Sequence, residues 1–169
     1  MDKTRKKKGD DAEKFVAGIL KERGYMVEIH PRTFRIIYIH GKPIQVSKDN
    51  DYYNLFDVKA EASDHMIYAQ VKFENEKANV SKAQKDIDRD FPYEFGYQKI
   101  QTWQVWDEWV KLEKGRRHKE FRYRIQERRG FTDKFWKNTE TKKGNWITVD
   151  IDSLIEPIQK PVRMEEMEE

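Results

Sequence analysis

The 169-residue chain contains no cysteine, which excludes disulfides, thiolate metal sites and cysteine nucleophiles. It has no apolar run near the roughly 20 residues that a membrane-spanning helix needs, and no apolar signal region at its start. We therefore expect a soluble, cytoplasmic protein. The sequence also lacks a glycine-rich phosphate loop and a nucleophile elbow, which disfavours ATP-driven and serine-based chemistry.

Histidine is sparse as well. The four histidines, His30, His40, His65 and His118, are scattered along the chain and do not have the spacing of a zinc site. None of them has a cysteine partner, so a structural zinc ion is not expected.

The composition is that of one polar globular domain. Hydrophobic residues make up 37% of the chain and aromatic residues 13%, which is enough for one modest core. We expect a single domain over residues 1–163, with a basic flexible arm at residues 1–8 and an acidic tail at residues 164–169.

The positive charge is unevenly distributed. Residues 111–143 contain thirteen Lys or Arg against five Asp or Glu, and the first eight residues contain five against one. Such stretches can bind a phosphate backbone, although each can also be an ordinary solvated face or a flexible arm. Aromatic or aliphatic residues alternate with arginine over residues 121–125, which predicts a strand with an arginine-bearing outer face. The candidate DNA-binding residues are Lys6, Lys7, Lys8, Arg116, Arg117, Arg122 and Arg124.

Two predicted strands in the middle of the chain carry polar residues at unusual places. Residues 65–73 alternate apolar and other side chains, so that Gln70 and Lys72 share the face opposite the apolar one. Residues 55–58 form a second short apolar strand, and Asp57 places a carboxylate within it.

A hard divalent cation such as Mg²⁺ explains this carboxylate, because Mg²⁺ is held by one or two carboxylates together with a substrate phosphate. Asp57 would be the central ligand, Gln70 would supply a carbonyl oxygen, and Lys72 would orient water or offset phosphate charge. The alternative is structural, with Asp57 capping a turn, Gln70 satisfying a strand edge and Lys72 in solvent.

A helix over residues 10–24 brings a further carboxylate. Its apolar residues recur with helical spacing, and Gly24 is a natural stop. At about 100° per residue, Glu13 lies at the edge of the apolar face and is carried toward whatever the helix covers.

The remaining segments predict a mixed α/β fold. We expect a strand over residues 25–30, a hairpin over residues 35–46, a strand over residues 121–125 and another over residues 146–151. Residues 99–110 fit either one long strand or a strand running into a helix, with Trp103 and Trp106 in the core. The spacing of a capping box predicts a helix from Ser81 to a point before residue 92, with Gln84 and Lys82 as accessory site residues.

Taken in order, Lys8-Gly9, Glu13, Gly24-Tyr25, Asp57 and Gln70-Val71-Lys72 resemble the PD-(D/E)XK restriction-endonuclease-like nucleases, most closely the archaeal Holliday junction resolvases. The resemblance covers roughly residues 8–90. It implies an αβββαβ core and an Mg²⁺- or Mn²⁺-dependent site in which Glu13, Asp57 and Gln70 bind metal and Lys72 completes the catalytic set. The chain departs from the family pattern in having Phe56 in place of proline and Gln70 in place of an acidic residue.

We therefore expect an α/β fold with a mixed central sheet, an αβββαβ core and a β-rich, basic and aromatic C-terminal extension. The expected function is metal-dependent endonucleolytic cleavage of DNA. A branched DNA substrate and a homodimer follow from the resemblance alone. The alternatives are a catalytically inactive nucleic-acid-binding protein that retains the nuclease fold and, less favoured, an RNA-processing nuclease.

Overall fold

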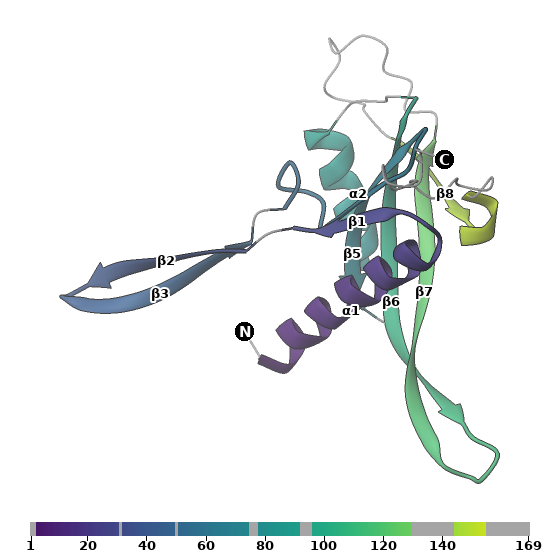
Figure 1. Ribbon diagram of the computed structural model, residues 1–169, viewed down its shortest axis with the longest axis horizontal. Coiled ribbons are helices and arrows are strands. Elements are labelled where there is room, and N and C mark those ends of the chain that lie inside the picture. Colours follow the sequence, from purple (N-terminus) through teal and green to yellow (C-terminus); the bar gives the residue numbers. More distant parts are fainter. Residues whose placement is uncertain are drawn as a thin grey trace, which may run out of the picture.

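The computed structural model describes residues 3–30, 32–49, 51–74, 78–91, 96–129 and 144–154. The protein is α/β, with two helices, a curled six-stranded mixed sheet and a separate two-stranded hairpin (Figure 1). This confirms the predicted class and the mixed sheet. No helix in these ranges is long and apolar enough to cross a membrane. The elements are α1 (Lys3–Glu22), β1 (Met26–Ile29), β2 (Arg32–Ile39), β3 (Lys42–Asp49), β4 (Val58–Glu61), β5 (Met66–Phe73), α2 (Ala78–Asp90), β6 (Gln98–Lys111), β7 (Arg117–Arg129), β8 (Asn145–Val149) and a 3₁₀ turn at Ile151–Leu154.

The strand order of the large sheet is β1-β4-β5-β6-β7-β8. Only β5 and β6 are parallel, and α2 lies in the connection between them, while all other neighbours are antiparallel. A parallel pair needs a crossover connection of about a dozen residues or more, which explains why the second helix lies at this point of the chain.

Helix α1 covers one side of the sheet and begins earlier than predicted. Its buried residues Ala12, Val16 and Leu20 belong to a core cluster with residues of β4, β5 and β6. Residues 3–8, which we expected in a flexible arm, lie in the first turns of α1, since lysine and arginine are good helix formers. Lys8 Nζ lies 3.5 Å from an Asp107 carboxylate oxygen and 5.4 Å from the centre of the Phe73 ring.

Helix α2 also begins earlier than the sequence indicated. It starts at Ala78, and its buried Val80 precedes Ser81, so the predicted capping box at residues 81–84 is wrong. The helix therefore starts near its first buried apolar residue, Val80, and not at Ser81. Further along, Ile87 belongs to a second core cluster that includes Phe56 and Tyr68.

Residues 99–110 belong to one long strand, which decides between the two predicted forms. Strand β6 pairs with β7 along Gln101–Lys111, and the two extend beyond the sheet as a twisted hairpin (Figure 1). Trp103 is buried as predicted and stacks on Tyr123 with 5.3 Å between ring centroids, whereas Trp106 is only partly buried.

A buried ion pair ties α2 to the end of the sheet. Asp88 lies 3.3 Å from Arg128 Nη1 and accepts hydrogen bonds from the Gly144 backbone N–H (3.0 Å) and from the Trp146 indole N–H. A Cβ atom on Gly144 would lie 2.4 Å from Arg128 Cδ, so only glycine fits against this pair. The acidic tail at 164–169 and residues 130–143 of the basic stretch lie outside the described residues.

The predicted hairpin over residues 35–46 is confirmed as β2 and β3. Its two-residue turn has φ of 51° at His40 and 73° at Gly41. Positive φ at both central positions gives the turn whose twist matches that of the flanking strands.

Candidate metal centre

Strand register brings three polar residues into one row. Ile29 pairs with Val58 in the β1–β4 ladder, and Val58 pairs with Ala69 in the β4–β5 ladder. One step along each antiparallel ladder therefore places His30 opposite Asp57 and Asp57 opposite Gln70. The His30 N–H donates to the Asp57 carbonyl at 2.9 Å, and this bond continues the β1–β4 ladder.

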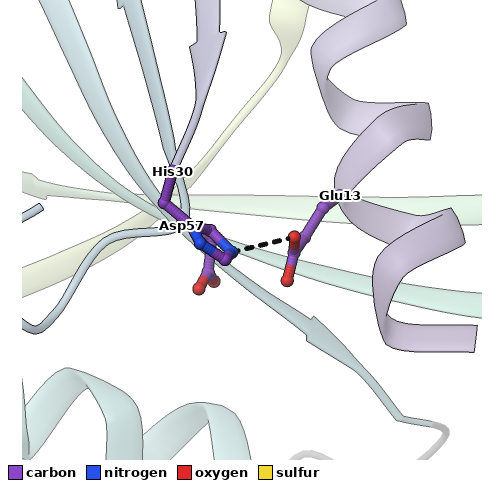
Figure 2. Close-up of side chains that lie close together, drawn as sticks. All are labelled: Glu13, His30 and Asp57. Atoms are coloured by element: carbon purple, nitrogen blue, oxygen red, sulfur yellow. Dashed lines mark hydrogen bonds and ion pairs between the residues drawn. The ribbon is translucent and has the colours of Figure 1, made fainter. Parts of the chain in front are cut away.

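Helix α1 adds Glu13 to this row. His30 Nε2 lies 3.1 Å from Glu13 Oε2 (Figure 2). Glu13, His30 and Asp57 each offer a ligand atom, and these three atoms lie within 4.8 Å of one another. Two carboxylates and an imidazole from three separate elements thus converge on one point.

The Asp57 carboxylate lies in a setting that disfavours its charge. The residue is 6% exposed, and its Oδ2 accepts hydrogen bonds from the Val71 backbone N–H at 2.8 Å and from the Gln70 amide at 2.9 Å. Burial raises the pKa of Asp57 to about 7, and the negative charge of Glu13 adds to the rise, while the bond from Val71 opposes it. A cation beside Asp57 would favour the charged carboxylate and so lower its pKa.

His30 has a nitrogen that the described residues leave without a hydrogen bond. The residue is 7% exposed, and its Nδ1 is buried with no hydrogen-bond partner in the described part of the chain. The carboxylate of Asp51 lies near it, with Oδ1 at 3.7 Å. A buried imidazole nitrogen without a partner is uncommon, and an ion or an ordered water normally satisfies such a group.

These observations fit a divalent cation. The donor set of two carboxylate oxygens and one imidazole nitrogen suits Mn²⁺ or Zn²⁺ as well as Mg²⁺, since imidazole favours the softer ions. The partnerless His30 nitrogen and the buried Asp57 carboxylate are the two groups that such an ion would satisfy.

Gln70 and Lys72 stand beside the three ligands and open onto a pocket. The pocket has a volume of about 430 Å³. Lys82 of α2 also lines it, together with the acidic residues Asp51, Glu74 and Asp86. Gln70 thus connects the ligand cluster with a cavity that carries two lysines.

The predicted catalytic residues Glu13, Asp57, Gln70 and Lys72 are therefore brought together, with one change of role. Gln70 donates its amide N–H to Asp57, so it orients the aspartate, and His30 lies at the cluster where we expected the third ligand.

Of the two predicted accessory residues, one lies at the pocket and the other does not. Lys82 lines the pocket, whereas Gln84 points to the sheet and donates to Thr102 Oγ1 at 3.0 Å and to Gln126 Oε1 at 2.7 Å. Gln84 is thus a structural link between α2 and the strands β6 and β7.

The predicted DNA-binding residues fall into two groups. Lys6, Lys7, Arg116 and Arg117 are exposed, the first two on α1 and the others near the tip of the β6–β7 hairpin. The remaining three are engaged within the protein. Lys8 pairs with Asp107, Arg122 pairs with Glu108 at 2.8 Å, and Arg124 donates to Thr148.

His30 and Asp51 are the site residues that the sequence did not reveal. Both flank the β2–β3 hairpin, so the chain leaves the site after His30 and returns to it at Asp51. The available signal was the position of His30 at the end of a predicted strand next to the Asp57 strand, and no zinc-type spacing accompanies it.

No protein-family model and no curated protein matches the chain. A solved structure with some similarity is "Crystal structure of SSO0001", from an archaeal protein, with 14% sequence identity and a TM-score of 0.33. The match covers 67% of this chain and 48% of that one, so this chain spans about half the length of the protein it matches.

Proposed function

We propose that the protein is a divalent-cation-dependent DNA endonuclease of the PD-(D/E)XK type. The observation that carries the proposal is the convergence of Glu13, His30 and Asp57 within 4.8 Å, with Lys72 and Gln70 on the adjoining strand. These residues come from four elements and are as much as 59 positions apart in the chain, yet together they form the ligand and lysine set of a phosphodiesterase.

The order of the elements supports this assignment. If the separate β2–β3 hairpin is set aside as an insertion, the chain runs α1-β1-β4-β5-α2-β6. This is the αβββαβ order that the sequence resemblance implies. The candidate ligands lie in α1, at the end of β1 and just before β4, and the lysine lies in β5.

The ligands favour Mn²⁺ over Mg²⁺, because imidazole nitrogen suits transition metals better than it suits magnesium. A divalent ion bound by Glu13, His30 and Asp57 would supply Lewis-acid polarisation of a phosphoryl oxygen and lower the pKa of bound water.

The neighbouring residues have separate roles in this proposal. Gln70 holds the Asp57 carboxylate in place by its 2.9 Å hydrogen bond. Lys72 lines the pocket and places a positive charge where a scissile phosphate would enter, which stabilises the charge that develops on the phosphoryl oxygens. Lys82, on the opposite wall in α2, would bind an adjacent phosphate.

A nucleic acid is the favoured substrate because the protein exposes cations on α1 and on the β6–β7 hairpin. Lys6, Lys7, Arg116 and Arg117 are exposed cations without sequence-reading geometry, and such residues bind phosphates without regard to base identity. The preference for branched DNA rests on the resemblance to the resolvases.

The test is a digestion panel with four-way, flapped, linear duplex and single-stranded DNA, each with Mn²⁺, with Mg²⁺ and with EDTA. We expect cleavage that requires metal and that is lost in Asp57→Asn and Lys72→Ala. The matched control is His65→Gln, because His65 is a partly buried, hydrogen-bonded histidine outside the cluster.

Equal cleavage by wild type and Asp57→Asn would refute the nuclease assignment. Binding of DNA without cleavage of any substrate would instead favour the inactive DNA-binding alternative. The hydrogen bond from Gln70 to Asp57 is compatible with that alternative, since it accounts for Gln70 without a metal. Cleavage of matched RNA in preference to DNA would point to an RNA-processing enzyme.

A further inference from the structure

The β2–β3 hairpin is a ribbon that projects away from the rest of the protein (Figure 1). Its strands have eight residues each and, within the described part of the chain, pair with one another in a sheet of their own. At about 3.4 Å per residue the ribbon is about 27 Å long. A two-stranded hairpin alone is only marginally stable in water, so a ribbon of this length normally has a partner surface.

Apolar side chains are exposed on both faces of the ribbon. Ile36 and Tyr38, 63% and 73% exposed, alternate along β2 and share one face. Ile39 and Ile44, 46% and 43% exposed, lie on the other face. A surface of this kind marks an interaction site rather than an ordinary solvent-facing strand.

The charge of the ribbon identifies the partner. Residues 32–49 contain four Lys or Arg and one Asp, although the whole chain is nearly balanced with 34 basic and 31 acidic residues. Arg35 and Lys42 are exposed. Two such ribbons would repel one another in a symmetric dimer, whereas a phosphate backbone attracts both cations.

The ribbon also starts and ends at the candidate metal centre. His30 precedes β2, Asp51 follows β3, and the two side chains approach to 3.7 Å. A polymer that binds the base of the ribbon therefore lies next to the ligand cluster.

We propose that the β2–β3 ribbon enters the major groove of duplex DNA and holds the duplex beside the metal centre. The major groove is about 12 Å wide and admits a two-stranded β-ribbon. Arg35 and Lys42 contact phosphates, and Ile39 and Ile44, which lie on the same face of the ribbon as these two cations, make apolar contacts to base edges such as thymine methyl groups. This inference rests on the proposed nuclease for what happens to the bound strand, but the binding itself does not require cleavage.

The first test shortens the ribbon in the full chain. Residues 35–46 are replaced by an Asn-Gly dipeptide that joins residues 34 and 47, which pair in the register, so the base of the hairpin keeps its geometry. Binding to a labelled 30-base-pair duplex is measured by fluorescence anisotropy in EDTA, where no cleavage occurs. We expect binding at least about tenfold weaker than that of the wild type.

The second test uses substitutions of exposed residues, which keep the fold intact if the shortened ribbon does not. Arg35→Ala with Lys42→Ala should reduce the slope of log K against log salt by about 1.8, because each lost phosphate contact removes about 0.9. Lys21→Ala with Lys85→Ala, two exposed helix lysines, is the matched control and should leave the slope unchanged. Ile44→Ala should weaken binding with no change in slope, because Ile44 lies on the same face as Arg35 and Lys42 and carries no charge.

Groove placement is read by dimethyl sulfate, which methylates guanine N7 in the major groove and adenine N3 in the minor groove. Protection of N7 that disappears with the shortened ribbon supports the proposal, and protection of N3 overturns it. Unchanged duplex binding after shortening also overturns it. A dimer that becomes a monomer, with DNA binding intact, would assign the ribbon to a second copy of the chain. If wild type binds through the ribbon but does not cut, only the nuclease assignment fails.

Discussion

Replacing Asp57 by asparagine should stabilise the metal-free protein at neutral pH while abolishing its response to metal. Asparagine keeps the shape of the side chain and an oxygen that accepts the Val71 N–H, but it carries no charge into a site that is 6% exposed. The wild type must either bury that charge or hold a proton, and this is the origin of the expected pH dependence.

The magnitude follows from the pKa. Burial raises the pKa of Asp57 from 3.8 to about 7, and each pKa unit corresponds to about 1.4 kcal/mol, so the total is about 4 kcal/mol. The contribution of the raised Asp57 pKa to the free energy of unfolding is fully present below pH 3.8. It decreases as pH rises toward 7, because the unfolded chain ionises while the native chain holds its proton, and it is lost above pH 7.

The assay is urea unfolding of wild type and Asp57→Asn in EDTA, at pH values from 4 to 8.5. As the pH rises from 4 to 7, the unfolding free energy of wild type should fall by about 4 kcal/mol relative to that of Asp57→Asn. Above pH 7 the difference should stay constant. Asp86→Asn, which removes a more exposed carboxylate of the neighbouring pocket, is the control for carboxylate loss in general. If the unfolding free energies of wild type and Asp57→Asn differ by the same amount at every pH, Asp57 does not have a raised pKa in the folded protein. With Mn²⁺ at 100 times its Kd, wild type should gain about 2.7 kcal/mol and Asp57→Asn almost nothing.

Three further predictions concern other residues. His30→Gln should weaken Mn²⁺ binding more than tenfold by calorimetry while His65→Gln leaves it unchanged, since only His30 lies in the cluster. Lys72→Ala should lower the cleavage rate about 10²- to 10³-fold and keep the Mn²⁺-induced thermal shift, and loss of both would make its role structural. Asp88→Ala should destabilise the fold by about 3 kcal/mol in urea, because it removes the carboxylate that balances the buried Arg128 guanidinium, and a change below about 1 kcal/mol would contradict this.

Local patterns predicted most of the elements. The alternation over residues 65–73 and the glycine at the tip of the hairpin each report on a few neighbouring residues, and β5 and the β2–β3 hairpin formed where expected. The starts of α1 and α2 were missed because contacts such as Lys8 with Phe73, remote in sequence, decide where a helix remains ordered.

The candidate site was predictable only where chemistry and local pattern coincide. Asp57 was found because a carboxylate within a predicted apolar strand is unusual, although the strand itself, β4, begins only at Val58. His30 was missed because its approach to Asp57 depends on the register between β1 and β4, which are separated by an 18-residue hairpin and its flanking residues. A single sequence gives no measure of which of several registers forms, so the row of His30, Asp57 and Gln70 could not be derived from it.

The ribbon has a structural consequence for how the protein can be altered. Because its two roots lie side by side at His30 and Asp51, its length and sequence can change at little entropic cost and without moving the ligands out of place. A ribbon of different length or composition can therefore be inserted between His30 and Asp51 while the six-stranded sheet and the two helices keep their arrangement.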